Sequence, residues 1–117
     1  MEENEETFGY QENQHIQEVL EELEFSLSLL EPTLFLAKPV RLSIRKRDNS
    51  FSGIIVSYKG VIGFVPLYEL KKPYRELRAA EQLIKEGKLI EVYLLKISES
   101  KDLSQWETPI FSMFSPS

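Results

Sequence analysis

The side chains of this sequence that could do chemistry are aromatic and basic residues that alternate along its middle third. Aromatic rings stack on nucleic-acid bases at about 1–3 kcal/mol per base, and Lys and Arg contact phosphates. This interleaving is typical of a surface for single-stranded nucleic acid. In the competing interpretation Phe51 and Phe64 are core residues and the charges form an ordinary solvated surface. The residues concerned are Arg41, Arg45, Arg47, Phe51, Tyr58, Lys59, Phe64, Tyr68, Lys71, Lys72, Tyr74 and Arg75.

The sequence contains no set of residues suited to catalysis or to metal binding. The chain has no cysteine and one histidine, His15, so it offers neither a zinc-ligand set nor a His-activated nucleophile. It has no Gly-rich phosphate loop, and paired carboxylates such as Glu21 and Glu22 fall on a solvated helix face. We therefore expect a non-enzymatic protein without a metal or other cofactor.

The net charge of −5 is the sum of two parts of opposite sign. Residues 1–37 hold ten glutamates and no Lys or Arg, whereas residues 38–117 hold all 14 Lys and Arg against nine acidic residues. The basic part is compatible with nucleic-acid binding. No apolar run reaches the ~20 residues of a membrane span, and the N-terminus does not look like a secretory signal. We expect a single-domain cytoplasmic protein with no membrane contact, whose oligomeric state the sequence does not indicate.

The acidic part divides into a tail and a helix. Residues 1–12 have no apolar period and are predicted to be a disordered tail. The segment 13–37 is predicted to consist of an amphipathic helix over residues 13–31 and a connector that leads to the barrel. Three roles are open for the helix: it caps the barrel as part of the core, it docks a protein partner, or it covers the basic face and competes with nucleic acid. The docking stripe would be formed by Ile16, Leu20, Leu23 and Leu27.

Residues 38–117 follow the order strand, strand, strand, helix, strand, strand. The helix is predicted between Pro73, which suits a first helical position, and Gly87, which suits the residue after the end. A polar loop that contains Trp106 precedes the last strand. This order predicts a mainly β fold, a five-stranded OB-type β-barrel with a helix between strands three and four. The predicted strands are 40–47, 51–58, 61–70, 87–97 and 109–114.

The stretch Gly63-Phe64-Val65-Pro66-Leu67-Tyr68-Glu69-Leu70, after a glycine-punctuated strand and a tight turn, resembles the centre of an S-one domain. Gly87-Lys88-Leu89-Ile90-Glu91-Val92 is similar to the entry of that family's fourth strand. The resemblance to this family of RNA-binding domains covers about residues 40–100. Phe51 stands where the family often has its first stacking Phe, whereas Ile54 and Pro66 replace its usual Phe and His.

The resemblance implies binding of single-stranded RNA on the outer face of strands two and three. Phe51, Phe64, Tyr58 and Tyr68 would stack on bases, and Arg45, Arg47, Lys59 and Lys71 would hold phosphates. The alternative, suggested by the replaced positions and the acidic helix, is a protein-interaction adaptor or complex subunit built on a degenerate barrel. We expect a single-stranded RNA-binding accessory protein and keep the adaptor as the alternative; the fold alone does not choose a biological process.

Overall fold

The computed structural model describes residues 2–99, 105 and 107–116 of the chain, and Trp106 lies outside them. The described part is mainly β and has two α-helices. Neither helix of this part combines the length and the apolar composition that a membrane span requires. The elements in chain order are α1 (Glu2–Ser26), β1 (Leu34–Ile44), β2 (Phe51–Tyr58), β3 (Val61–Pro66), the 3-10 turns η1 (Leu67–Glu69) and η2 (Lys72–Arg75), α2 (Leu77–Glu86), β4 (Ile90–Glu99) and β5 (Glu107–Ser112).

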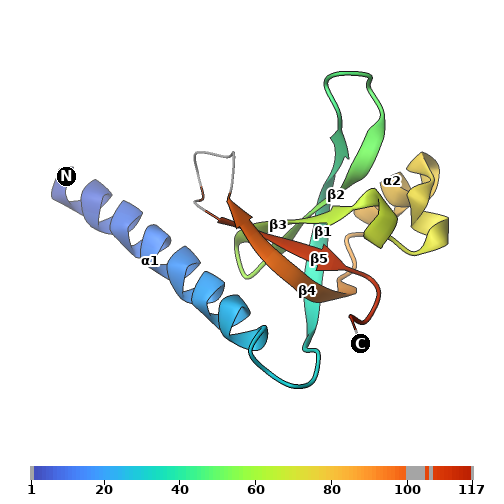
Figure 1. Cartoon of the computed structure of the whole chain (residues 1–117). Coiled ribbons are helices and arrows are strands. Elements are labelled where there is room, and N and C mark those ends of the chain that lie inside the picture. The colour runs from blue at the N-terminus through green and yellow to red at the C-terminus, as the bar shows by residue number, and fades with distance from the viewer. Residues whose placement is uncertain (1, 100–104, 106, 117) are drawn as a thin grey trace.

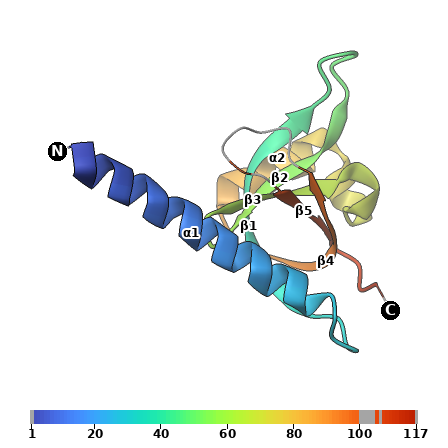
Figure 2. The same cartoon turned by 60° about the vertical axis from the view of Figure 1, so that its left-hand side comes forward.

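The five strands form one mixed sheet that closes into a ring in the order β1-β2-β3-β5-β4 (Figures 1 and 2). All neighbouring strands are antiparallel except β3 and β5, which are parallel and meet at Phe64 and Ile110. Because the ring closes, each described strand has two neighbours, each over part of its length. The faces and ends of the ring are surfaces available for function.

Strand β1 starts at Leu34, six residues before the start that the sequence predicted. Its first four residues, 34–37, pair with β4 and close the ring, whereas residues from Lys38 onward pair with β2. The expected start of the barrel at residue 38 therefore falls inside a strand. Two features hid this start: Leu34 and Leu36 are apolar although they face outward, and Pro39 lies next to a bulge, one of the few places where a strand accepts proline.

Helix α1 is longer at its beginning and shorter at its end than the sequence predicted. It begins at Glu2, so residues predicted as a disordered tail are helical, and it ends at Ser26 rather than near Glu31. Glu and Gln are good helix formers, and glutamates near the N-terminus interact favourably with the helix dipole. After Ser26 the chain forms turns, in which the amide of Leu27 donates to the carbonyl of Glu24 (3.1 Å).

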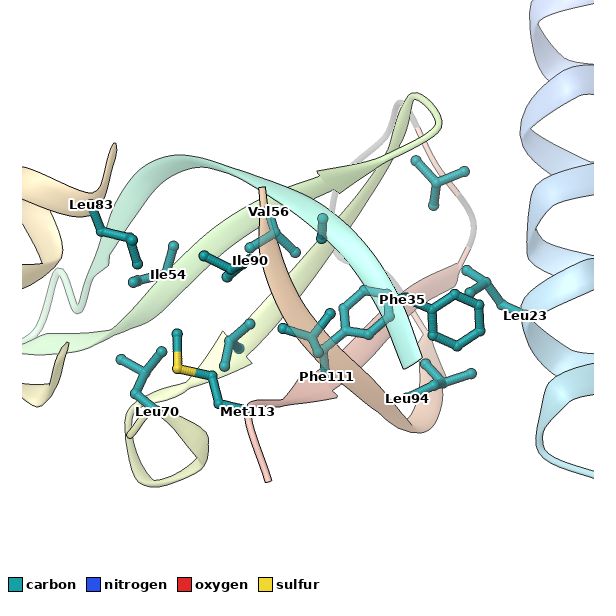
Figure 3. Close-up of a cluster of buried hydrophobic side chains, with 14 of the residues drawn as sticks. Leu23, Phe35, Ile54, Val56, Leu70, Leu83, Ile90, Leu94, Phe111 and Met113 are labelled. Atoms are coloured by element: carbon teal, nitrogen blue, oxygen red, sulfur yellow. The ribbon is translucent and has the colours of Figure 1, made fainter. Parts of the chain in front are cut away.

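The core fills the ring and continues at both ends into the helices. Figure 3 shows Leu23 of α1 on one side and Leu83 of α2 on the other, with Phe35 and Phe111 between them. The rings of Phe35 and Phe111 meet edge to face, with centroids 6.2 Å apart. The two helices thus cap opposite ends. Gly87, at a φ of +65°, ends α2 in the left-handed conformation that the sequence predicted for that position.

Candidate nucleic-acid interface

Phe64 lies on the outer face of β3. Val61, Gly63 and Val65 are buried, whereas Ile62, Phe64 and Pro66 are half-buried, which is the alternation of a strand with one face inward. Gly63 faces the interior, since a Cβ placed there would lie 2.5 Å from the ring of Phe111. Phe64 therefore points away from the core and does not belong to the buried cluster.

The ring of Phe64 lies against the backbone of β2 at Gly53. A Cβ at Gly53 would be 2.8 Å from the ring, and Gly53 also has a φ of +148°, which side chains rarely adopt. Glycine is required here by both space and conformation. The ring of Phe64 is thus supported on one side by β2 and stays partly exposed.

The loop between β1 and β2 projects from one end of the ring and carries Arg45 and Arg47, both exposed (Figures 1 and 2). The amide of Arg45 donates to the carbonyl of Ser50 (2.9 Å), and Asn49, with a φ of 59°, donates to the carbonyl of Arg45 (2.8 Å). The hydroxyl of Ser50 donates to the Asp48 carboxylate (2.6 Å), and this bond lowers the pKa of Asp48 below 3.8. The loop thus has a defined shape that displays cations.

Tyr68 and Lys71 lie at the same end of the ring as this loop. Pro66 pairs with Gly53 near the start of β2, and η1 continues from Pro66 in contact with β2. Tyr68 is 77% exposed. The guanidinium of Arg75 donates to the carbonyls of Leu70 (3.0 Å) and Tyr68 (3.3 Å), which ties η1 to η2.

Phe51 and Tyr58 are half-buried and pack against the core. The competing interpretation expected this of Phe51 and of Phe64, and Phe64 faces outward instead. The ring of Tyr58 meets that of Phe35 edge to face, with centroids 5.2 Å apart. Its hydroxyl donates to Glu22 (3.3 Å). These two rings have only part of their surface left for a ligand.

Lys59 is separated from the other predicted phosphate contacts. Lys59 follows the end of β2, whereas the loop with Arg45 precedes the start of β2. The strand spans seven residue steps, which at ~3.3 Å each correspond to about 23 Å. The Lys59 ammonium pairs with Glu22 of α1 (3.1 Å), and the hydrogen bond to Glu22 raises the pKa of Lys59 above 10.5. Nε2 of His15 donates to the carbonyl of Lys59 (2.8 Å), so α1 holds this turn by two contacts.

The stripe of α1 that the sequence offered for docking packs largely against the ring of strands. Leu20 and Leu23 are buried in the core cluster, and Ile16 packs against it. Leu27 is 46% exposed, beyond the end of the helix. The first of the three roles considered for this helix, capping the barrel as core, is therefore the one that these contacts support.

The sequence did not reveal the contacts of Glu22 and His15 with residues about 40 positions away. No local pattern announces such pairs, although the opposite charges of the two parts of the chain made an attraction expected. Comparisons of the chain with protein-family models, curated protein sequences and solved structures found no match.

Proposed function

We propose that this chain is a non-enzymatic accessory protein that binds single-stranded RNA on an OB-type barrel. Three features of the sheet support this fold type: the strand order, the parallel pairing of β3 with β5, and the helix between β3 and β4. OB-folds bind oligonucleotides on the face of strands two and three and with the loop between strands one and two. The resemblance of residues 40–100 to S-one domains supports the same ligand.

The observation that carries the proposal is the gathering of aromatic and basic side chains at one end of the outer face. Phe64 lies on that face and Tyr68 is exposed at its end, so both can stack on bases. Arg45, Arg47 and Lys71 are exposed around the same end and would contact phosphates. In this proposal Phe51 and Tyr58 contribute only their exposed edges, and Lys59 contributes little while Glu22 holds it.

The numbers of stacked bases and phosphate contacts determine the expected affinity and its dependence on salt. Two stacked bases contribute about 2–6 kcal/mol, and three phosphate contacts give a slope of log K against log salt of about −2. Raising the salt concentration from 50 to 200 mM would then weaken binding about 16-fold. Binding that is weak and salt-sensitive suits an accessory protein that follows an RNA backbone without reading a long sequence.

The test is fluorescence anisotropy of a labelled, unstructured RNA dodecamer titrated with the full chain at 50 and 200 mM salt. The full chain is used because α1 belongs to the core and residues 34–37 close the ring. The double variant Arg45→Gln/Arg47→Gln should reduce the salt slope by about 1.4. The control Lys88→Gln/Lys96→Gln removes two exposed charges next to and within β4 and should leave the slope unchanged.

Two outcomes would count against the proposal. Absence of binding by the full chain at 50 mM salt would exclude this surface as an RNA site. An equal loss of binding in the Arg and Lys double variants would mean that net charge, rather than the described surface, attracts the RNA.

A further inference from the structure

A groove at the other end of β1 plays no part in the proposed RNA surface. It lies where the connection from α1 to β1 passes β4 and Pro116, and its volume is about 240 Å³. Leu34 opens β1 beside this groove, whereas the loop with Arg45 follows the end of that 11-residue strand. At ~3.3 Å per residue, the strand between the two places is about 33 Å long measured along its course. The lining is mostly apolar, with Leu27, Leu29, Leu30, Phe35, Tyr93 and Leu94.

The connection between α1 and β1 exposes several large apolar side chains, which is unusual for a surface loop. Leu27, Leu29 and Leu34 are each between 44% and 47% exposed, and Leu30 is completely exposed. Connecting segments are ordinarily polar, and a contiguous apolar patch with charged neighbours is typical of an interaction site. Figure 1 shows the connection as a loop that extends clear of the sheet, where another molecule can reach it.

The charge around the groove indicates the chemistry of its occupant. Residues 1–37 contain no Lys or Arg, and Glu31 lines the groove. Glu21 and Glu24 are exposed on the last turns of α1, and Glu91 is exposed on β4 opposite Leu36. This field repels anionic lipid surfaces and nucleic acids and attracts cationic groups. An apolar groove in an acidic setting is complementary to a segment that is apolar on one face and basic on the other.

We propose that the groove is the docking site for a basic amphipathic helix of a protein partner. Leucine-like side chains of that helix would fill the groove against Leu29 and Leu30, and its Lys or Arg would face Glu24 and Glu31. The site goes beyond the proposed RNA binding, and the distance along β1 leaves both surfaces free to be occupied together. In this proposal the protein partner contacts the segment that follows α1, and not the stripe of α1 that is buried against the ring.

The test uses the full chain and a fluorescein-labelled, 18-residue helical peptide of leucine and lysine as the probe. Fluorescence anisotropy should show binding of this peptide and no binding of a matched peptide with Glu in place of every Lys. Leu29→Ser/Leu30→Ser should weaken binding at least tenfold without changing the charge of the protein. The control Leu77→Ser/Leu89→Ser changes two exposed leucines elsewhere, 44% and 57% exposed, and should bind as the unchanged protein does.

Each opposite result would overturn the proposal in a distinct way. Equal binding by both double variants would mean that the acidic helix attracts the peptide without use of the groove. Concentration-dependent dimerisation in sedimentation experiments, abolished by Leu29→Ser/Leu30→Ser, would assign the groove to a second copy of this chain. RNA binding by the same variant separates the two proposals, because it should remain unchanged whether or not the peptide docks.

Discussion

At the scale of single residues, the outer face of this ring depends on Phe64 and Gly53. The absence of a side chain at Gly53 lets the aromatic ring lie on the neighbouring strand. A half-exposed aromatic side chain that packed only against other mobile side chains would lose more entropy when a base stacked on it. The support that β2 provides is thus a physical reason to place the main stacking position at Phe64.

We expect Phe64→Ala to weaken binding of single-stranded RNA by about 5- to 150-fold, because one stacked base contributes roughly 1–3 kcal/mol. Anisotropy titrations measure the change, and circular dichroism checks that the fold is retained. Phe25→Ala is the matched control, since Phe25 is 67% exposed on α1, away from this face. Equal affinities for the two variants would remove Phe64 from the site.

A second prediction at this scale concerns Lys59 and Glu22. The hydrogen bond to Glu22 raises the pKa of Lys59 above 10.5, so the pair stabilises the folded protein below pH 10.5 and this contribution is lost as the pH rises through the folded-state pKa. The melting temperature of Glu22→Gln should lie slightly below that of the unchanged protein at pH 8. The difference should vanish above the folded-state pKa of Lys59, and also at high salt. A difference independent of pH would show that the ion pair is not its source.

At the scale of elements, α1 is as much a part of the core as the strands are. Val19, Leu20 and Leu23 close the end of the ring near Phe35, and Glu22 and His15 fasten the helix to the turn between β2 and β3. Isolated acidic helices are marginally stable in water, so the packing of this face must supply most of the stability of the helix.

Leu23→Ala should lower the free energy of unfolding by about 2–5 kcal/mol, because it opens a cavity at a fully buried site. Urea titration followed by circular dichroism measures this loss. Phe25→Ala, on the same helix but largely exposed, should change stability by no more than about 0.5 kcal/mol. Similar small losses in both variants would show that the helix does not contribute to the core.

At the scale of the whole molecule, the acidic helix α1 and the loop that carries Arg45 and Arg47 lie at opposite ends of the ring. The glutamate-rich helix covers one end of the ring, and Arg45 and Arg47 project from the other. The Debye length is about 8 Å at physiological ionic strength and about 30 Å at 0.01 M. Charges about 23 Å apart along β2 are therefore screened from each other at physiological ionic strength and interact at 0.01 M salt.

Replacement of Glu18, Glu21 and Glu24 by Gln should strengthen RNA binding several-fold at 0.01 M salt and leave it unchanged at 0.15 M. The reason is that the helix acts on the RNA surface only through its long-range field. Anisotropy titrations at the two salt concentrations measure the effect. An equal gain at both would instead mean that α1 covers the RNA surface directly and competes with the ligand.

The sequence alone determined the features that depend on neighbouring residues. The run of β-branched residues predicted β2 at 51–58, and Gly87 marked the end of α2. The predicted helix start at Pro73 was wrong, because Pro73 lies in η2 and α2 begins at Leu77. The charge difference between the two parts of the chain and the mainly β character also followed from composition and periodicity. These features are local because hydrogen-bonding period, capping and turn formation act over a few residues.

Only the tertiary structure decided which side chains of the candidate site lie together. The register between β1 and β2 skips Ser52, which changes the alternation of β2 next to Phe51, so periodicity alone could not tell that Phe51 packs on the core. The pairing of Lys59 with Glu22, 37 residues apart, and the closure of the ring by residues 34–37 are long-range contacts. Their energies come from burial and charge in the assembled fold, which no short stretch of sequence contains.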